Sequence, residues 1–213
     1  MNYETIIFAN GDIPTHSIPL ELLKNAKNIV CCDGAIKKLQ QLGYNPTAIV
    51  GDMDSISPEV KHQFAHLLFQ DPSEEYNDLQ KAIRFCIHQK WNHIAILGGF
   101  GLREDHALAN LAIMMQYVLE YNSSINNEIN IEMFTNNGVF SAFSDTKTFS
   151  SYPKQQISIF SFKQDTLLTF EGLKYPVHNR SFHYLWEGSL NEAITDQFTI
   201  QCSGGEVIVF RNY

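Results

Sequence analysis

Two aspartates, Asp52 and Asp54, follow directly after the apolar, β-branched run of residues 47–50. In an open α/β sheet, ligands bind beyond the carboxyl ends of the strands, so this spacing predicts two carboxylates at a binding edge. Carboxylate oxygens suit Mg²⁺, which proteins usually hold with one or two carboxylates and the phosphates of a substrate. The alternative is an ordinary strand-to-helix turn, in which a following serine caps the next helix.

Three other apolar runs in the first half of the chain end in a similar way. Residues 5–9 lead into Asn-Gly-Asp, residues 28–32 into Asp33 and Gly34, and residues 93–97 into a turn that contains Gly98, Gly99 and Gly101. Short apolar runs bounded by Gly and Asp are typical of buried parallel strands, and helical patterns lie between them. The alternation predicts an α/β fold with a largely parallel sheet and flanking helices. Each polar cluster then falls at the same edge of that sheet.

The glycine-rich turn leads into the longest predicted helix, from Asp105 to about residue 121, with Leu108 among the residues that face the sheet. Glycines let a backbone approach a ligand, and a helix N-terminus offers unpaired N–H groups to phosphate. Arg103, inside the turn, has the fork geometry that binds phosphate oxygens. The plainer alternatives are that Asp105 is a helix cap and that His106 and Asn110 are polar groups on the helix surface.

Five aspartates converge at the predicted sheet edge: Asp33, Asp52, Asp54, Asp78 and Asp105. Asp78 opens another predicted helix, where capping is the ordinary role of such a residue. Carboxylates that share one site repel one another strongly unless a cation offsets their charge. The number of acidic groups therefore favours a metal-dependent active site over five unrelated structural roles.

The character of the chain changes near residue 137, where helical periodicity gives way to segments that alternate apolar and polar residues. This alternation predicts an antiparallel β domain, most simply a small β-sandwich, with the link 203–205 as a hairpin turn between the last two strands. We therefore expect an α/β domain over residues 1–137 and a β-sandwich domain over residues 138–213. The polar segment 122–127 is predicted to be an exposed connection.

Composition limits the function further. The formal net charge of −8 over 213 residues argues against a nucleic-acid surface, which needs concentrated Lys and Arg. No apolar stretch has the length of a membrane helix and no signal peptide opens the chain, so we expect no membrane partner and a cytoplasmic location. Four cysteines lack metal-site spacing and are interpreted as reduced, mostly buried thiols: Cys31, Cys32, Cys86 and Cys202.

The motifs around these residues resemble those of the thiamine pyrophosphokinases in order and spacing. They comprise Asp33-Gly34-Ala35, residues 51–55, residues 77–82, residues 97–106 with Asn110 and, more loosely, residues 172–176 and 188–192. The resemblance implies an α/β nucleotide domain followed by a β-sandwich, and a homodimer with active sites at the subunit interface. It also implies a thiamine diphosphokinase, which transfers the pyrophosphoryl group of ATP to the hydroxyl of thiamine and releases AMP. Leu102 departs from the pattern, because a glycine is common at its position.

The resemblance implies roles for individual residues. Asp52, Asp54 and Asp78 would bind Mg²⁺, and the catalytic groups would be Asp54, Asp78, Asp105 and Arg103. The nucleotide would be held by Asp33, Gly34, Gly98, Gly99, Gly101, Arg103, His106 and Asn110. Ser189 and Asn191 would orient thiamine from the second domain. Which carboxylate accepts the proton of the alcohol stays open, with Asp54 and Asp78 as the candidates.

Two other classes of protein use some of the same features. A Mg²⁺-dependent nucleotide phosphohydrolase would need the same acidic edge, but the chain lacks the sequence context of an aspartyl nucleophile. A non-catalytic nucleotide-binding regulator would need no complete acidic cluster. Both explain less of the chain than a thiamine pyrophosphokinase does.

Overall fold

The computed structural model describes residues 3–122 and 129–213, and its contacts divide the chain into two compact units. The N-terminal unit comprises residues 1–114 and 128–136, and the C-terminal unit comprises residues 115–127 and 137–213. Of the polar connection predicted over residues 122–127, only Asn122, the last residue of a helix, lies within the described residues.

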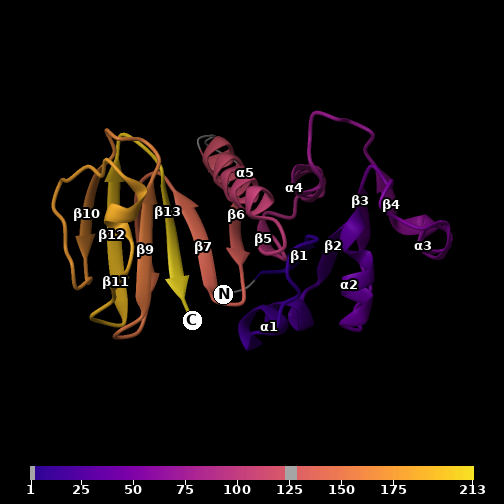
Figure 1. The fold of residues 1–213 in the computed structure, drawn as a ribbon, viewed down its shortest axis with the longest axis horizontal. Coiled ribbons are helices and arrows are strands. Elements are labelled where there is room, and N and C mark those ends of the chain that lie inside the picture. Colours follow the sequence, from indigo (N-terminus) through magenta and orange to yellow (C-terminus); the bar gives the residue numbers. More distant parts are fainter. Residues whose placement is uncertain (1–2, 123–128) are drawn as a thin grey trace. The chain divides into compact units, whose positions relative to one another are not determined.

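The strands of the N-terminal unit form a parallel sheet in the order β4-β3-β2-β1-β5-β6 (Figure 1). Their bounds are Thr5–Phe8 for β1, Asn28–Cys32 for β2, Ala48–Gly51 for β3, Leu68–Gln70 for β4, His93–Leu97 for β5 and Asn130–Phe134 for β6. Every described pairing among them is parallel. Apolar residues occupy most positions of β1, β2, β3 and β5, because both faces of a parallel sheet are covered. The predicted α/β fold class is confirmed.

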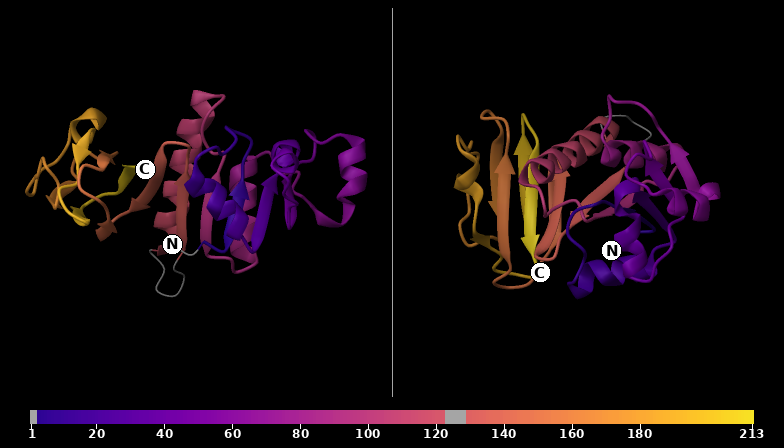
Figure 2. Two further views of the ribbon diagram at one scale, coloured as in Figure 1. Left: turned by 90° about the horizontal axis from the view of Figure 1, so that it is seen from below. Right: turned by 45° about the vertical axis from the view of Figure 1, so that its right-hand side comes forward.

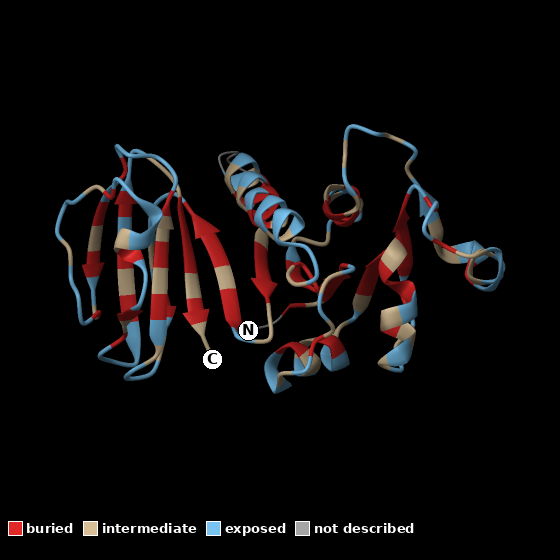
Figure 3. Ribbon diagram, in the orientation of Figure 1, coloured by how far each residue is buried: buried red, intermediate tan, exposed pale blue. Residues whose placement is uncertain are grey.

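Within the described residues, five α-helices follow the pattern that the sequence predicts. They are α1 (Ser17–Asn25), α2 (Ile36–Gln41), α3 (Pro58–Gln63), α4 (Asp78–His88) and α5 (Glu104–Asn122). Ser57 caps α3, and Asn77 forms a capping box with Gln80 at the start of α4. Figure 3 shows that α3 has no buried residue, whereas the strands β1, β2, β3 and β5 are largely buried.

The buried face of α5 differs in part from the predicted one. Leu108 is 66% exposed, whereas Met114 is fully buried and Leu111, Tyr117 and Val118 are also buried. The prediction that Leu108 faces the sheet was therefore wrong. Apolar residues surround much of this helix, so its periodicity does not determine which stripe is covered.

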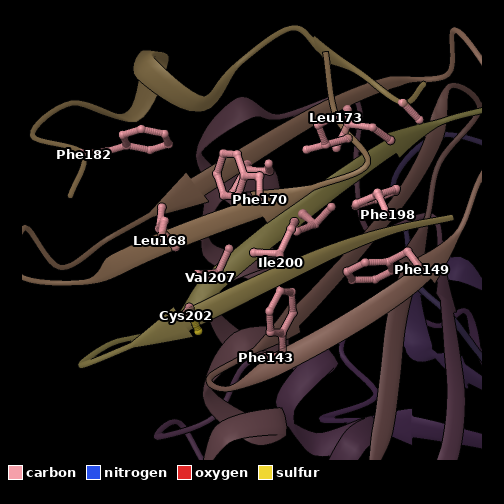
Figure 4. Packing of buried hydrophobic residues seen from close by; sticks show 14 residues of the cluster. Phe143, Phe149, Leu168, Phe170, Leu173, Phe182, Phe198, Ile200, Cys202 and Val207 are labelled. Carbon is pink, nitrogen blue, oxygen red and sulfur yellow. The ribbon is translucent and has the colours of Figure 1, made fainter. Parts of the chain in front are cut away.

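The C-terminal unit is a sandwich of two antiparallel sheets (Figures 1 and 2). One layer has the order β11-β9-β13-β7 and the other β10-β12-β8. Their bounds are Gly138–Phe143 for β7, Thr146–Ser150 for β8, Gln156–Ser161 for β9, Leu167–Glu171 for β10, Asn191–Glu192 for β11, Gln197–Ser203 for β12 and Val207–Asn212 for β13. Inward-facing aromatic and aliphatic side chains from both layers form its core (Figure 4), including Phe143, Phe149, Phe170, Phe198 and Val207. The predicted sandwich is confirmed.

The link between β12 and β13 does not close a hairpin, so that part of the prediction was wrong. β12 pairs with β10 and β8, whereas β13 pairs with β7 and β9 in the other sheet. The link carries the chain from one layer to the other through Gly204, whose φ is 82°. A Gly-rich turn between two alternating strands looks the same in sequence whether the strands pair or change sheets.

Two further observations concern the whole described chain. All four cysteines are free and buried, as the sequence predicts. Across residues 3–122 and 129–213, no helix is both long and apolar enough to cross a membrane.

Candidate active site

Asp33 and Asp52 leave the parallel sheet from the carboxyl ends of neighbouring strands. β2 and β3 pair with Cys32 opposite Val50. Asp33 follows Cys32 directly and begins the 3-10 turn Asp33–Ala35, and Asp52 follows the last residue of β3. Because parallel strands end at a common edge, the two carboxylates are placed side by side although 18 residues separate them in sequence.

Asp33, Asp52 and Asp54 form a group that we call the acid cluster. Each offers one carboxylate oxygen, and the three oxygens lie within 4.8 Å of one another. Asp33 is buried, whereas Asp52 and Asp54 are exposed. The Asp52 carboxylate accepts the amide N–H of Asp54 at 3.0 Å, across a turn in which Met53 has a left-handed φ of 70°. This tight turn holds two acidic side chains over the third.

One oxygen of Asp33 lacks a hydrogen-bond donor. Its Oδ2 accepts the amide N–H of Met53 at 2.9 Å, but the buried Oδ1 has no hydrogen-bond partner among the described residues. The carboxyl group lies so close to β3 that a Cβ atom on Gly51 would stand 2.7 Å from its Cγ. A buried acceptor without a donor costs about 1–3 kcal/mol of folding free energy. A ligand that binds this oxygen would remove that cost.

The carboxylates of this edge influence one another's ionisation. Burial, and after it the negative charge of Asp78, raise the pKa of Asp33 to about 6, against the hydrogen bonds from the amides of Gly34 and Met53. Burial also raises the pKa of Asp78, with the charge of Asp52 acting in the same direction. The amide N–H of Asp54 lowers the pKa of Asp52. Asp78, at the start of α4, is therefore electrostatically part of the same edge.

The acid cluster has the properties of a site for a hard divalent cation such as Mg²⁺. Its donors are all carboxylate oxygens, one of them is buried without a hydrogen-bond partner, and its negative charge is concentrated enough to oppose ionisation of Asp33. The sequence predicts Asp52, Asp54 and Asp78 as metal ligands. The structure groups Asp52 and Asp54 with Asp33, and Asp78, whose role as a ligand stays a prediction, acts on that group through its charge.

A cavity of about 220 Å³ lies at the same edge of the N-terminal unit. It is lined by Ala9, Asn10, Gly11, Cys32, Asn77, Asp78, Leu79, Gly98, Gly99, Gly101, Leu102, Arg103, His106 and Asn110. We call it the glycine pocket. It brings together Asp78 and all of the nucleotide-binding residues predicted from the turn after β5. Asn10 and Gly11 were not among the predicted site residues, although the Asn-Gly-Asp sequence after the first strand was a usable signal.

The glycines of this pocket are required by the packing of two loops against each other. The amide of Gly11 donates to the carbonyl of Gly98 at 2.7 Å, and the amide of Asp12 donates to the carbonyl of Phe100 at 2.7 Å. A Cβ atom on Gly11 would overlap both of those carbonyl groups. Asn110 donates from Nδ2 to the carbonyl of Gly99 at 2.8 Å and so braces the turn from α5.

Lys38 fixes the other wall of the pocket. Its Nζ donates to the carbonyl of Asn10 and to the carbonyl of Gly11, at 2.7 Å each. No sequence pattern identifies this role, because Lys38 is a polar residue on a short helix 27 residues after Gly11. The walls of the pocket are therefore held by hydrogen bonds within the N-terminal unit.

Arg103 and Asp105 form an exposed ion pair beside the pocket. Arg103 donates from Nε to Oδ1 of Asp105 at 3.1 Å and from Nη2 to Oδ2 at 2.6 Å. These bonds lower the pKa of Asp105 to about 2. The sequence predicts Asp105 among five converging acids, whereas the structure pairs it with Arg103 and begins α5 at Glu104, so Asp105 is not the helix cap. An exposed pair contributes little stability, so Arg103 can exchange Asp105 for an anionic ligand at small cost.

The residues predicted to bind thiamine lie in the C-terminal unit, where their side chains form hydrogen bonds with its backbone. Asn191 is 6% exposed, accepts the amide of Tyr175 at 3.0 Å and donates to its carbonyl at 2.9 Å. Ser189 is exposed and donates to the carbonyl of Trp186 at 2.7 Å. Both side chains shape loops that carry exposed aromatic rings, among which Tyr184 and Trp186 are stacked.

The sequence matches two models of one protein family. Residues 20–127 match the catalytic domain of thiamin pyrophosphokinase, and residues 138–210 match its substrate-binding domain. This chain belongs to the thiamin pyrophosphokinase family. The predicted family and the predicted enzyme class, a thiamine diphosphokinase, are confirmed.

Individual relatives support the assignment to the thiamin pyrophosphokinase family. The chain is 26% identical to thiamin pyrophosphokinase 1 of Caenorhabditis elegans, over 92% of this chain and 84% of the relative. Two solved structures share its fold. Thiamine pyrophosphokinase from Bacillus subtilis has a TM-score of 0.79 at 22% identity and covers 98% of both chains. Thiamin pyrophosphokinase from Candida albicans has a TM-score of 0.81 at 19% identity, over 98% of this chain and 89% of that one.

Proposed function

We propose that this enzyme transfers the pyrophosphoryl group of ATP to the hydroxyl of thiamine in a Mg²⁺-dependent reaction, giving thiamine diphosphate and AMP. The observation that carries the proposal is the acid cluster, with its buried unpartnered oxygen, at the same sheet edge as the glycine pocket. Family membership supplies the substrates, and the site supplies a place for a metal and a phosphate chain together.

The metal would be held by Asp33, Asp52 and Asp54, with Asp78 as a further ligand or as a charge beside them. A bound Mg²⁺ supplies charge neutralisation at the phosphate oxygens and at the leaving AMP. The protein's own contribution is to hold these carboxylates at one sheet edge before the substrate arrives. Such positioning is most of what catalysis of phosphoryl-type transfer requires.

The phosphate chain of ATP would lie in the glycine pocket. Backbone amides of the turn through Gly98, Gly99 and Gly101 would donate to its oxygens there, together with the N-terminus of α5. Arg103 would leave Asp105 and bind phosphate oxygens, because its exposed pair is weak. His106 and Asn110 stay predicted nucleotide-binding residues that line the pocket.

The reaction requires a proton acceptor for the thiamine hydroxyl. The hydroxyl oxygen attacks the β-phosphorus, the bond from that phosphorus to the α-bridging oxygen breaks, and the electron pair leaves with AMP. Asp78 is the better candidate for the base, since burial raises its pKa toward the working range of a general base and it lines the pocket. Asp54 is the alternative.

The remaining predicted properties also belong to this proposal. Residues 1–137 would bind nucleotide and metal, and residues 138–213 would bind thiamine, with Ser189 and Asn191 shaping the loops that receive it. A homodimer is supported by the large exposed apolar side chains of the C-terminal unit, such as Trp186 and Leu190. The free, buried cysteines suit a reducing compartment such as the cytoplasm.

The proposal is tested by ³¹P NMR of the purified protein with ATP and Mg²⁺, with and without thiamine. We expect AMP and thiamine diphosphate to appear only when thiamine is present. ADP and phosphate formed regardless of thiamine would identify a hydrolase instead. Unchanged ATP under both conditions, with binding retained, would identify a nucleotide-binding regulator.

A further inference from the structure

Leu102 is an exposed apolar residue of the glycine pocket. It lies in the turn between β5 and α5, lines the pocket and is 71% exposed. The other apolar side chains of the lining, those of Ala9, Cys32 and Leu79, are buried and offer little surface to a ligand. Among the described residues that line the pocket, Leu102 is therefore the one that presents a large apolar side chain to a ligand.

The backbone holds Leu102 in a conformation that costs free energy. Its φ is 66°, in the left-handed region that residues with a Cβ atom disfavour, and it follows Gly101, whose φ is 84°. The amide of Arg103 donates to the carbonyl of Gly101 at 2.8 Å, which closes a three-residue turn around Leu102. A Cβ atom on Gly101 would stand 2.0 Å from Cγ of Asp12, so the Asp12 carboxyl group packs against this turn. The backbone at Leu102 is therefore fixed before any ligand binds.

The strain and the exposure of Leu102 indicate a role in binding. A glycine at this position would relieve the left-handed strain, and a polar side chain would avoid exposing apolar surface to water. Strained residues persist mainly where they serve a ligand or a reaction. An apolar side chain adds nothing to the binding of phosphate oxygens, which need N–H donors or cations such as the turn amides and Arg103. Leu102 therefore suits an apolar part of the ligand.

We propose that Leu102 packs against the base of the bound nucleotide and raises the affinity for ATP through that contact. This inference rests on the proposed function, because it takes ATP as the ligand of the pocket. The base is the part of ATP that has flat, apolar faces. Leu102 lines the pocket and directly follows Gly101, so a nucleoside attached to phosphates at the turn lies within reach of its side chain. The contact removes apolar surface from water and favours a nucleotide over an inorganic polyphosphate.

Three substitutions separate the apolar contact from the geometry of the turn. Leu102→Gly removes both the side chain and the strain. Leu102→Asn places a polar side chain of similar size at a left-handed position, which Asn tolerates, and Leu102→Met keeps the apolar surface. We expect Leu102→Gly and Leu102→Asn to bind ATP about five- to thirtyfold more weakly, as for the lost burial of part of a leucine side chain. Leu102→Met should stay within about threefold of the wild type.

The experiment is titration calorimetry of the full-length protein with ATP and with inorganic tripolyphosphate, each at saturating Mg²⁺. Tripolyphosphate carries the phosphate chain without ribose and base, so every variant should bind it within about threefold of the wild type. Lys90→Gly is the matched control, because Lys90 also has a left-handed φ, 63°, and is exposed, but does not line the pocket. It should bind both probes as the wild type does. Steady-state kinetics of Leu102→Gly should show a raised KM for ATP at nearly unchanged kcat, as for a contact made equally in the ground state and the transition state.

Weaker binding of ATP at unchanged binding of tripolyphosphate, in both Leu102→Gly and Leu102→Asn, supports the proposal. Unchanged affinity for ATP in these variants overturns it. Equal losses for the two probes also overturn it, because they would show that residue 102 acts only through the shape of the turn. Retained affinity for ATP with a raised KM for thiamine would mean that Leu102 contacts thiamine instead.

The ³¹P experiment separates this result from the proposed function. A wild type with thiamine-dependent turnover, together with unaltered ATP binding in the variants, refutes only the contact of Leu102 with the base. A wild type without that turnover, but with the selective loss of ATP affinity in the variants, refutes only the reaction. A wild type that does not bind ATP refutes both.

Discussion

Replacing Asp33 by Asn should make the metal-free enzyme more stable at neutral pH while removing its response to Mg²⁺. Asp33 is 1% exposed, and its Oδ1 has no donor among the described residues. An Asn side chain of the same shape carries no charge. Its carbonyl can still accept the amide of Met53, as Oδ2 of Asp33 now does at 2.9 Å. Its NH₂ group can donate to the carboxylates beside it.

The size of this effect follows from the pKa of Asp33. Burial and the charge of Asp78 raise that pKa from 3.8 to about 6, and one unit is about 1.4 kcal/mol. The full difference would be about 3 kcal/mol, which we reduce to about 1–2 kcal/mol because water at the sheet edge screens the charge. The folded state binds the extra proton between these two pKa values, so the wild type loses stability as pH rises from about 4 to about 6.

The assay is urea denaturation of the wild type and of Asp33→Asn with EDTA, at several pH values from about 4 to 7.5. We expect equal free energies of unfolding at the acid end and a gain of about 1–2 kcal/mol for the variant above pH 6. Added Mg²⁺ should stabilise the wild type and leave the variant nearly unchanged. Asp196→Asn, at an exposed site in the C-terminal unit, is the control and should show neither effect.

Two results would refute this reasoning. If Asp33→Asn is less stable than the wild type in EDTA at pH 7.5, the carboxylate is a structural acceptor and its burial is not a cost. If the variant is more stable by the same amount at every pH, the gain does not come from the ionisation of Asp33. Stabilisation of the variant by Mg²⁺, to the same extent as the wild type, would remove Asp33 from the metal site.

Three further substitutions test other parts of the site. Asp54→Asn should lower turnover at least a hundredfold, as loss of a group that neutralises transition-state charge does, with unchanged circular dichroism and melting temperature because Asp54 is exposed; unfolding of the variant would show a structural role. Leu102→Gly should raise the free energy of unfolding by about 0.5–1 kcal/mol, measured by urea denaturation, because glycine removes left-handed strain. Leu102 has a φ of 66° and is 71% exposed; a loss of stability would mean that its side chain packs. Asn191→Ala should destabilise the protein by about 1–3 kcal/mol, since it strands the backbone groups of Tyr175, and should raise the KM for thiamine; unchanged stability and KM would remove Asn191 from both roles.

The residues that directly follow each strand made much of the N-terminal unit predictable from the sequence. Apolar runs that end in Gly or Asp identified β1, β2, β3 and β5, and the same rule placed Asp33 and Asp52 at one edge. Both are local signals, because the residue after a strand must emerge at the end of that strand. The glycine turn was predictable for the same reason, and it lines the pocket together with Arg103, His106 and Asn110, whose nucleotide-binding role stays a prediction.

Other features depended on contacts that no local pattern contains. The exposed state of Leu108 and the passage of the chain between sheets after β12 both follow from which surfaces meet in three dimensions. The hydrogen bonds of Lys38 join residues 27 and 28 positions apart. Sequence periodicity indicates which side of a helix or strand could be buried, but not which neighbouring element covers that side.

The sequence by itself determined that this protein has a parallel α/β unit with acidic strand ends and a separate β-sandwich. Alternating hydrophobicity and strand-end residues are properties of consecutive positions, so they can be read without the fold. Only the packing of separate elements brings Asp33 next to Asp52 and Asp54 and leaves its Oδ1 buried without a hydrogen-bond partner among the described residues. Distances between side chains and the burial of charge arise when separate elements pack, and these quantities govern the metal and phosphate chemistry of the site.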